Sequence, residues 1–219
     1  MEQPAGFLKQ ARTASLRAAS HRRIRIEQVD PQIDDGRYPI KREVGDSVTV
    51  TADIFRDGHD KIAADLYFKP WYRTDWQSVP MVFLENDRWT GTFLVDQNTR
   101  YDYTIGAIPD DFQTWVEEIT KKFSAGLDVA LEIAEGMSLL RAAIARDAED
   151  APTIRDIRDA AAVAESQSEA VALLTGSRLA EFMRASLPEN ERVWYGKTLS
   201  VTVDRLRARY AAWYELFPR

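Results

Sequence analysis

The sequence predicts an α+β protein, an immunoglobulin-like antiparallel β-sandwich with an inserted small helical bundle. Three observations predict it. Apolar and polar residues alternate between Ser78 and Trp115, apolar residues recur at helical spacing after Asp128, and alternation returns at Leu199. Alternation is typical of strands with one buried face, whereas spacings of three and four residues are typical of amphipathic helices. Because a lone strand is not stable by itself, the strand after the helices is expected to return to the sandwich.

The central element is expected to be a hairpin between the alternating runs 79–83 and 89–95. Glu85, Asn86 and Asp87 lie between these runs and favour a turn. A third run, over 101–107, is closed by Pro109. Earlier runs at 24–29, 48–54 and 62–68 bring the expected total to at least six strands before Pro109. Turn signals recur at about the 8–12-residue spacing that is typical of a sandwich.

The segment from Phe112 to Phe123 fits two patterns. Phe112, Thr114 and Val116 alternate as in a strand. Trp115, Ile119 and Phe123 recur as on one face of a helix. We predict a strand for this segment, with a helix as the alternative.

Helices are expected between Asp128 and Asn190. The first carries an apolar stripe that includes Val129, Ile133 and Met137. The sequence 150–153 breaks this pattern, and further helices are expected at about 154–165, 169–175 and 177–186. Together they predict a small antiparallel bundle.

The expected domains follow from these patterns. Residues 22–127 and 191–208 form the sandwich, and residues 128–190 form the inserted bundle. The first 26 residues contain a single acid, Glu2, against one lysine and five arginines, which predicts a disordered basic tail over residues 1–21, with a transit peptide as the alternative. Near the C-terminus, residues 212–217 form a nearly continuous apolar run that resembles a buried strand and then stops, which predicts a cut chain.

Composition argues against several classes of function. The chain has no cysteine, so neither disulfides nor thiolate chemistry are available, and a reducing compartment is expected. A net charge of −6 argues against nucleic acid as the main partner, and no apolar run is long enough to span a membrane. The two histidines, His21 and His59, lack the spacing of a transition-metal site. No metal and no other cofactor is therefore expected.

No catalytic constellation is visible in the sequence. Asp110-Asp111 and Glu117-Glu118 are pairs of adjacent carboxylates. Glycosidase chemistry instead needs two carboxylates that face one another across a cleft. A turn and a solvated face account for these pairs. The expected set of catalytic residues is therefore empty.

An aromatic loop is the strongest candidate for a binding site. Trp71, Tyr72 and Trp76 lie in the loop after the run 62–68. Rings on such a loop can stack on the apolar C–H faces of sugars, which predicts carbohydrate binding. Packing on the end of the sandwich, or in a subunit contact, is the alternative, because aromatic residues are enriched at interfaces.

Several segments together resemble the N-terminal region of the bacterial α-1,4-glucan:maltose-1-phosphate maltosyltransferases, a family of the α-amylase superfamily (glycoside hydrolase family 13). The similar segments are residues 23–27 (RIRIE), 36–42 (GRYPIKR), 52–60 (ADIFRDGHD), 86–89 (NDRW), 100–101 (RY), 112–115 (FQTW) and 212–219 (AWYELFPR). The last of these is similar to the first strand of the superfamily's catalytic barrel. The resemblance therefore implies that residues 209–219 begin the first strand of a truncated barrel.

The resemblance implies a sandwich with a helical insertion, placed before a barrel that carries the catalytic carboxylates. The family moves maltosyl from maltose 1-phosphate to glucan ends. A cytoplasmic location is expected for this chain. Its nucleophile and acid/base residues have no counterpart here. We therefore expect a non-catalytic fragment that supports homodimer formation and positions the barrel. Its expected partners are a second copy of itself and, through the parent enzyme, α-1,4-glucan or maltooligosaccharide. A free-standing glucan-binding module is the alternative.

A dimer contact is expected on the apolar part of the last two helices, since the charges of the preceding helix alternate in sign as on a solvated face. The residues expected in that contact are Leu173, Leu174, Leu179, Phe182 and Met183.

Overall fold

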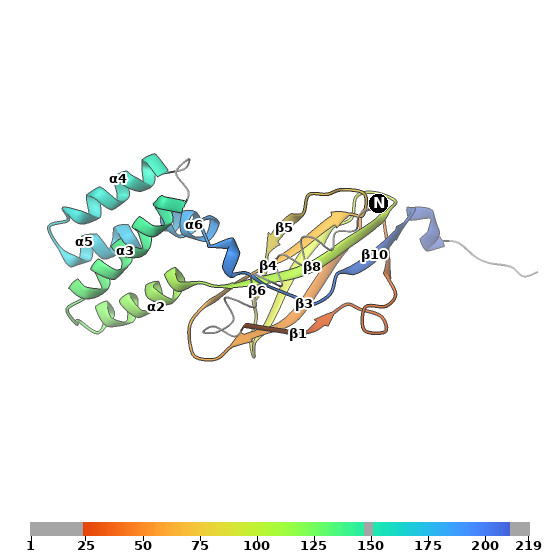
Figure 1. Cartoon of the computed structure of the whole chain (residues 1–219), viewed down its shortest axis with the longest axis horizontal. Helices are drawn as coiled ribbons and strands as arrows, with labels where there is room; N and C mark the ends of the chain where they lie inside the picture. Colours follow the sequence, from red (N-terminus) through yellow and green to blue (C-terminus); the bar gives the residue numbers. More distant parts are fainter. Residues whose placement is uncertain (1–23, 147–150, 211–219) are drawn as a thin grey trace, which may run out of the picture. The chain divides into compact units, whose positions relative to one another are not determined.

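The structure is a computed structural model that describes residues 24–146 and 151–210 (Figure 1). The predicted basic tail, residues 1–21, and residues 211–219 of the predicted barrel strand 209–219 lie outside the described residues. Residues 209–210 of that predicted strand belong to a 3₁₀ turn instead. Contacts divide the described chain into two units. The sheet unit comprises residues 24–57, 64–107 and 192–210, and the helical unit comprises residues 58–63, 108–146 and 151–191.

The strands form two sheets. The four-stranded sheet has the order β1 (Ile24–Asp30), β3 (Ser47–Arg56), β7 (Arg88–Leu94) and β6 (Val82–Phe83). The six-stranded sheet has the order β2 (Ile40–Glu43), β10 (Leu199–Asp204), β8 (Arg100–Pro109), β4 (Ile62–Pro70) and β5 (Gln77–Pro80), and β9 (Val193–Trp194) also pairs with β8. β10 is antiparallel to β8 and parallel to β2, so the strand that follows the helices does join a sheet. A 3₁₀ turn, η2 (Leu206–Tyr210), follows β10.

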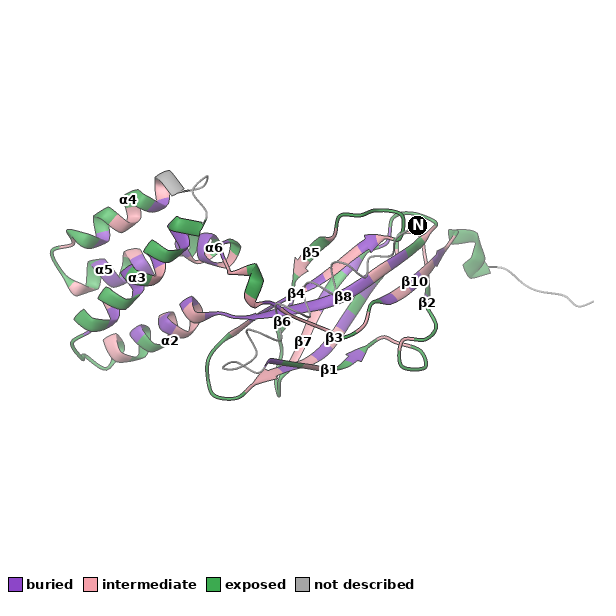
Figure 2. Cartoon of the chain, viewed as in Figure 1, coloured by how far each residue is buried: buried purple, intermediate pink, exposed green. Residues whose placement is uncertain are grey.

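The two sheets share an apolar core. Phe68 of β4 stacks on Phe93 of β7, with ring centroids 4.5 Å apart, and Phe93 also contacts the rings of Tyr101 and Tyr103 on β8. β8 is buried along most of its length (Figure 2). Tyr103 is fully buried, and its hydroxyl donates a hydrogen bond to the carbonyl of Pro31 at 2.5 Å. Because side chains alternate along each strand, one face of each sheet contributes side chains to this core, as a sandwich-like arrangement requires.

The predicted hairpin is confirmed as β6–β7, in which Phe83 pairs with Trp89. Asn86 and Asp87 both have positive φ, 48° and 63°, and the amide of Arg88 donates to the carbonyl of Glu85. Positive φ at both central residues is the conformation whose twist suits a two-residue hairpin, and Asn and Asp tolerate it well.

The run 79–83 was predicted as one strand, and this is wrong. Val79 belongs to β5, which pairs with β4, whereas Phe83 belongs to β6, which pairs with β7 in the other sheet. Pro80 is the last residue of β5 and has no N–H with which to continue the ladder. The chain therefore changes sheets at Met81, whose side chain is buried.

The helical unit contains α2 (Asp111–Ser124), α3 (Ala130–Arg146), α4 (Ala151–Ala162), α5 (Gln167–Leu174), α6 (Ser177–Ala185) and the 3₁₀ turn η1 (Glu189–Glu191). The chain is thus a mixed α/β protein with two sheets and five α-helices among its described residues. The core of the helical unit is made of apolar residues from all five of these helices.

The strand interpretation of residues 112–123 is wrong, because this segment is helix α2. The side chain of Asp110 accepts a hydrogen bond from the amide of Gln113 at 2.9 Å and so caps the helix. Phe112, Trp115 and Ile119 then point into the core, which is the helical rather than the alternating pattern. Two Glu–Lys pairs at spacing i,i+4 add support on the exposed face.

Candidate functional site

Two of the three predicted aromatic site residues lie side by side on the surface of the sheet unit. Trp71 and Tyr72 directly follow β4, and they are 55% and 52% exposed. Their ring centroids are 6.4 Å apart and the ring planes meet at 89°. We call Trp71, Tyr72 and the neighbouring Arg100 the aromatic corner.

The aromatic corner is held by contacts from the start of β8 and the loop before it. The amide of Trp71 donates to the carbonyl of Arg100 at 2.9 Å, and the Arg100 guanidinium lies 5.8 Å from the Trp71 ring centroid. The hydroxyl of Tyr72 donates to Oε1 of Gln97 at 2.5 Å. Each ring is therefore held by contacts with a neighbouring residue, although both rings are exposed to solvent.

Trp76 has a different environment. It is only partly exposed, and the ammonium of Lys69 lies 5.0 Å from its ring centroid. Lys69 is itself buried and donates to the carbonyl of Arg73 at 2.7 Å. The structure thus brings Trp71 and Tyr72 together and gives Trp76 a packing contact with Lys69.

Two cations, Arg100 and Lys69, and one acid, Asp102, lie beside the aromatic corner. Asp102 lies 3.3 Å from Nε of Arg100. Burial raises the pKa of the Asp102 carboxyl, and the positive charges of Arg100 and Lys69 oppose that rise. The Asp102 carboxylate thus offsets part of the positive charge of Arg100 and Lys69. The sequence did not predict Arg100, Asp102 or Gln97 as site residues, because their proximity to Trp71 and Tyr72 depends on how β4 lies beside β8.

A second group of aromatic and charged residues lies further along the same strands. Nη1 of Arg192 is 2.9 Å from Oδ2 of Asp65, and both side chains are largely buried. The Arg192 guanidinium lies 5.5 Å from the Tyr67 ring centroid, and the Tyr67 and Trp194 rings are 4.7 Å apart. This group, which we call the Arg192 cluster, links β4 to β9 within the sheet unit.

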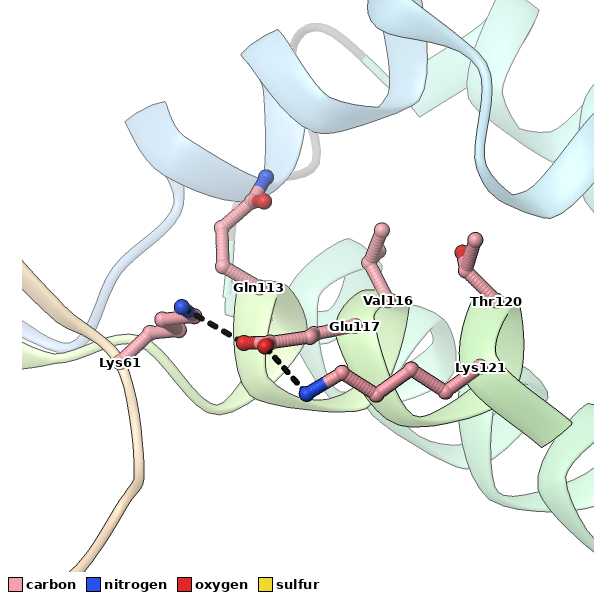
Figure 3. Close-up of a pocket in the computed structure, with 6 residues that line it drawn as sticks. All are labelled: Lys61, Gln113, Val116, Glu117, Thr120 and Lys121. Carbon is pink, nitrogen blue, oxygen red and sulfur yellow. Dashed lines mark hydrogen bonds and ion pairs between the residues drawn. The ribbon is translucent and has the colours of Figure 1, made fainter.

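The helical unit has a shallow hollow of about 390 Å³ along α2 (Figure 3). Glu117 contacts Lys121 at 2.5 Å and Lys61 at 2.6 Å. These two lysines lower the pKa of the Glu117 carboxyl to about 2. A carboxylate held ionised in this way is a poor general acid, so the hollow has no evident catalytic chemistry. Its lining residues are Lys61, Gln113, Val116, Glu117, Thr120 and Lys121.

The adjacent carboxylates of the sequence have structural roles. Asp110 caps α2, and burial raises the pKa of its carboxyl while the amide of Gln113 lowers it. Glu118 pairs with Lys122, which also contacts Glu132. Within residues 24–146 and 151–210, no group of three or more His, Asp or Glu residues is placed to hold a metal ion.

The residues predicted for the dimer contact lie in or against the core of the helical unit. Leu174, Leu179, Phe182 and Met183 are buried there, and Leu173 is partly buried against the same core. Their apolar character is thus accounted for within one chain. Use of this region in a dimer stays a prediction. In the described part of the chain, no helix combines the length and apolar character needed to cross a bilayer.

Comparison with known proteins identifies the family. Residues 22–205 match the family described as α-1,4-glucan:maltose-1-phosphate maltosyltransferase, domain N/S. Maltosyltransferases of that name from Myxococcus xanthus and Chlorobaculum tepidum are each 40% identical to the chain, over 206 and 200 residues. The one from Rhodospirillum rubrum is 37% identical over 211 residues.

These matches cover 89–90% of this chain but only 30–31% of each relative, in its N-terminal part. The agreement extends through both the sheet unit and the helical unit, since the family match runs from residue 22 to residue 205. The chain therefore belongs to the family of the N/S domain of α-1,4-glucan:maltose-1-phosphate maltosyltransferases.

Proposed function

We propose that the chain is a non-catalytic N-terminal part of a cytoplasmic maltosyltransferase, which moves maltosyl from maltose 1-phosphate to the ends of an α-1,4-glucan. Its own role is to support a homodimer and to position the catalytic barrel, with an immunoglobulin-like sandwich as the rigid part. The match of residues 22–205 to the N/S domain carries this proposal. The carboxylates of the described residues support it, because those at the hollow and at the start of α2 already serve ion pairs and a helix cap.

An activity assay tests the catalytic half of this proposal. Incubated with maltose 1-phosphate and glycogen, the chain alone is expected to release no phosphate. Glycosidase-type chemistry needs two carboxylates across a cleft, and in the described part of the chain the hollow along α2 is lined by a single one, Glu117. A longer protein that carries both this domain and a barrel serves as the positive control. Phosphate release by the chain alone, in proportion to its concentration, would contradict the proposal.

Light scattering coupled to size-exclusion chromatography tests the dimer. A species of about twice the 25.0 kDa chain mass is expected. We propose that Leu173 of α5 lies at the contact, supported from within by the buried Leu174, Leu179, Phe182 and Met183. Leu173→Glu is therefore expected to shift the mass towards that of one chain, because a charge in an apolar contact is costly.

Leu131→Glu is the matched control, since Leu131 is an apolar helix residue of the same unit that is 78% exposed. A monomeric wild-type chain at high concentration would remove the dimer from the proposal. An equal mass shift in both variants would instead show that the contact does not depend on α5.

A further inference from the structure

The aromatic corner has the shape expected for a curved sugar chain. Trp71 and Tyr72 are both more than half exposed, and their rings are nearly perpendicular rather than coplanar. Flat β-linked glucans stack best on coplanar rings. An α-1,4-linked glucan curves, so neighbouring glucosyl units present their C–H faces in different directions. Two rings at a right angle therefore suit the α-linked chain.

The rings are also pre-positioned before any ligand binds. Trp71 is fixed by the backbone hydrogen bond to Arg100 and by the Arg100 guanidinium over its ring, and Tyr72 is fixed by its hydrogen bond to Gln97. A ligand that stacks on rings already held in place loses little side-chain entropy. Tyr and Trp are efficient contact residues for this reason, since they offer large rigid surfaces with few rotatable bonds.

The surroundings favour a neutral, hydroxyl-rich ligand. Arg100 is paired with Asp102, and Lys69 is buried against Trp76 with its ammonium bonded to a backbone carbonyl. The corner thus has no concentrated positive charge that would select a phosphate or a nucleic acid. It does offer hydrogen-bonding groups beside both rings, namely the amide of Gln97 at the Tyr72 hydroxyl and the guanidinium of Arg100 over Trp71.

We propose that Trp71, Tyr72 and Arg100 form a non-catalytic binding site for a short stretch of α-1,4-linked glucan. This inference rests on the proposed function for its choice of ligand, because the relatives are named for their action on α-1,4-glucan. Sugar C–H faces stack on the two rings, and sugar hydroxyls bond to Arg100 and Gln97. The site holds a long glucan on the sheet unit by contacts that are separate from the chemistry.

Titration with maltoheptaose tests the site on the 219-residue chain itself, followed by calorimetry and by tryptophan fluorescence. Binding is expected for the unmodified chain. Trp71→Ala and Tyr72→Ala are each expected to weaken it at least about fivefold, the loss associated with removing a contributing aromatic residue. Tyr72→Phe keeps the ring and loses the hydroxyl that bonds to Gln97, so it should weaken binding less than Tyr72→Ala does.

Tyr38→Ala is the matched control. Tyr38 lies in the same unit, is 51% exposed, and has the Arg37 guanidinium 5.2 Å from its ring centroid, much like Trp71 and Arg100. It is expected to leave maltoheptaose binding unchanged. Cellohexaose, which is β-linked, should bind more weakly than maltoheptaose. Circular dichroism of each variant checks that the fold is retained.

Three results would overturn the proposal: no binding of maltoheptaose at millimolar concentration, equal binding of cellohexaose, or binding that survives both Trp71→Ala and Tyr72→Ala. None of these results would contradict the proposed function, because phosphate release and particle mass are measured separately. Conversely, phosphate release by the chain alone would overturn the non-catalytic role and leave the binding result standing.

Discussion

Replacing Arg192 with alanine is expected to lower the free energy of unfolding by about 3–5 kcal/mol, the cost of breaking a buried ion pair from one side. The Arg192 and Asp65 side chains are only 4% and 14% exposed, and their charged atoms are 2.9 Å apart. The truncation also removes the guanidinium from the face of Tyr67. Urea unfolding followed by circular dichroism would measure the loss.

Arg209→Ala is the control for an exposed arginine. Arg209 contacts both Glu43 and Asp46, at 2.8 and 2.6 Å, but its side chain is 45% exposed. Because water screens exposed ion pairs, its removal should cost far less than the removal of Arg192. The double variant Arg192→Met/Asp65→Leu should be more stable than Arg192→Ala, since it removes both buried charges together. Equal losses for Arg192→Ala and Arg209→Ala would show that burial does not control the strength of the pair.

The Arg192 cluster also explains a glycine in the middle of β8. A Cβ at Gly106 would lie 2.8 Å from Cδ of Arg192 and 3.1 Å from ring atoms of Tyr67 and Trp194. Glycine ordinarily weakens a strand, and here it gives the arginine room to lie across the sheet. Nothing in the local sequence signals this, because the four residues come from three separate strands and the turn before β9.

The sequence predicted correctly the elements whose signals lie within a few neighbouring residues. The β6–β7 turn was predictable because Asn86 and Asp87 both tolerate positive φ, and the return of the chain to the sheet was predictable from the alternation at 199–204. The helix α2 was missed because Phe112, Thr114 and Val116 also alternate. Asp110 was predicted to lie in a turn, whereas its side chain caps α2.

The aromatic corner was likewise predicted only in part. The exposed character of Trp71 and Tyr72 followed from their place in a polar loop. Their partners Arg100 and Gln97 did not, because the contact requires β4 and β8 to lie side by side with Trp71 bonded to Arg100. The grouping of Trp76 with the other two rings rested on sequence proximity, and the pairing of β4 with β5 is what brings Trp76 to Lys69 instead.

Replacing Trp115 with alanine is expected to destabilise the helical unit by about 3–5 kcal/mol, the usual cost of deleting a large buried aromatic side chain. Trp115 is 2% exposed, stacks on Phe112 with ring centroids 5.4 Å apart, and donates from Nε1 to the carbonyl of Glu132 at 2.7 Å. The variant therefore loses packing and also removes a donor from a buried carbonyl. Loss of helical circular dichroism at lower urea would report it.

Gly136 of α3 allows a more specific test of how Trp115 packs against that helix. A glycine-to-alanine change inside a helix normally stabilises by about 1 kcal/mol. At Gly136 the new Cβ would lie 2.3 Å from Cζ2 of the Trp115 indole, closer than any real contact, so Gly136→Ala should destabilise instead. In a Trp115→Phe background, Gly136→Ala should stabilise the protein instead. The outer part of the indole is absent there, and the preference of a helix for alanine over glycine remains. A double-mutant cycle measures this coupling directly. If Gly136→Ala has the same effect in both backgrounds, the close approach of α3 to the Trp115 ring is not what requires glycine at this position.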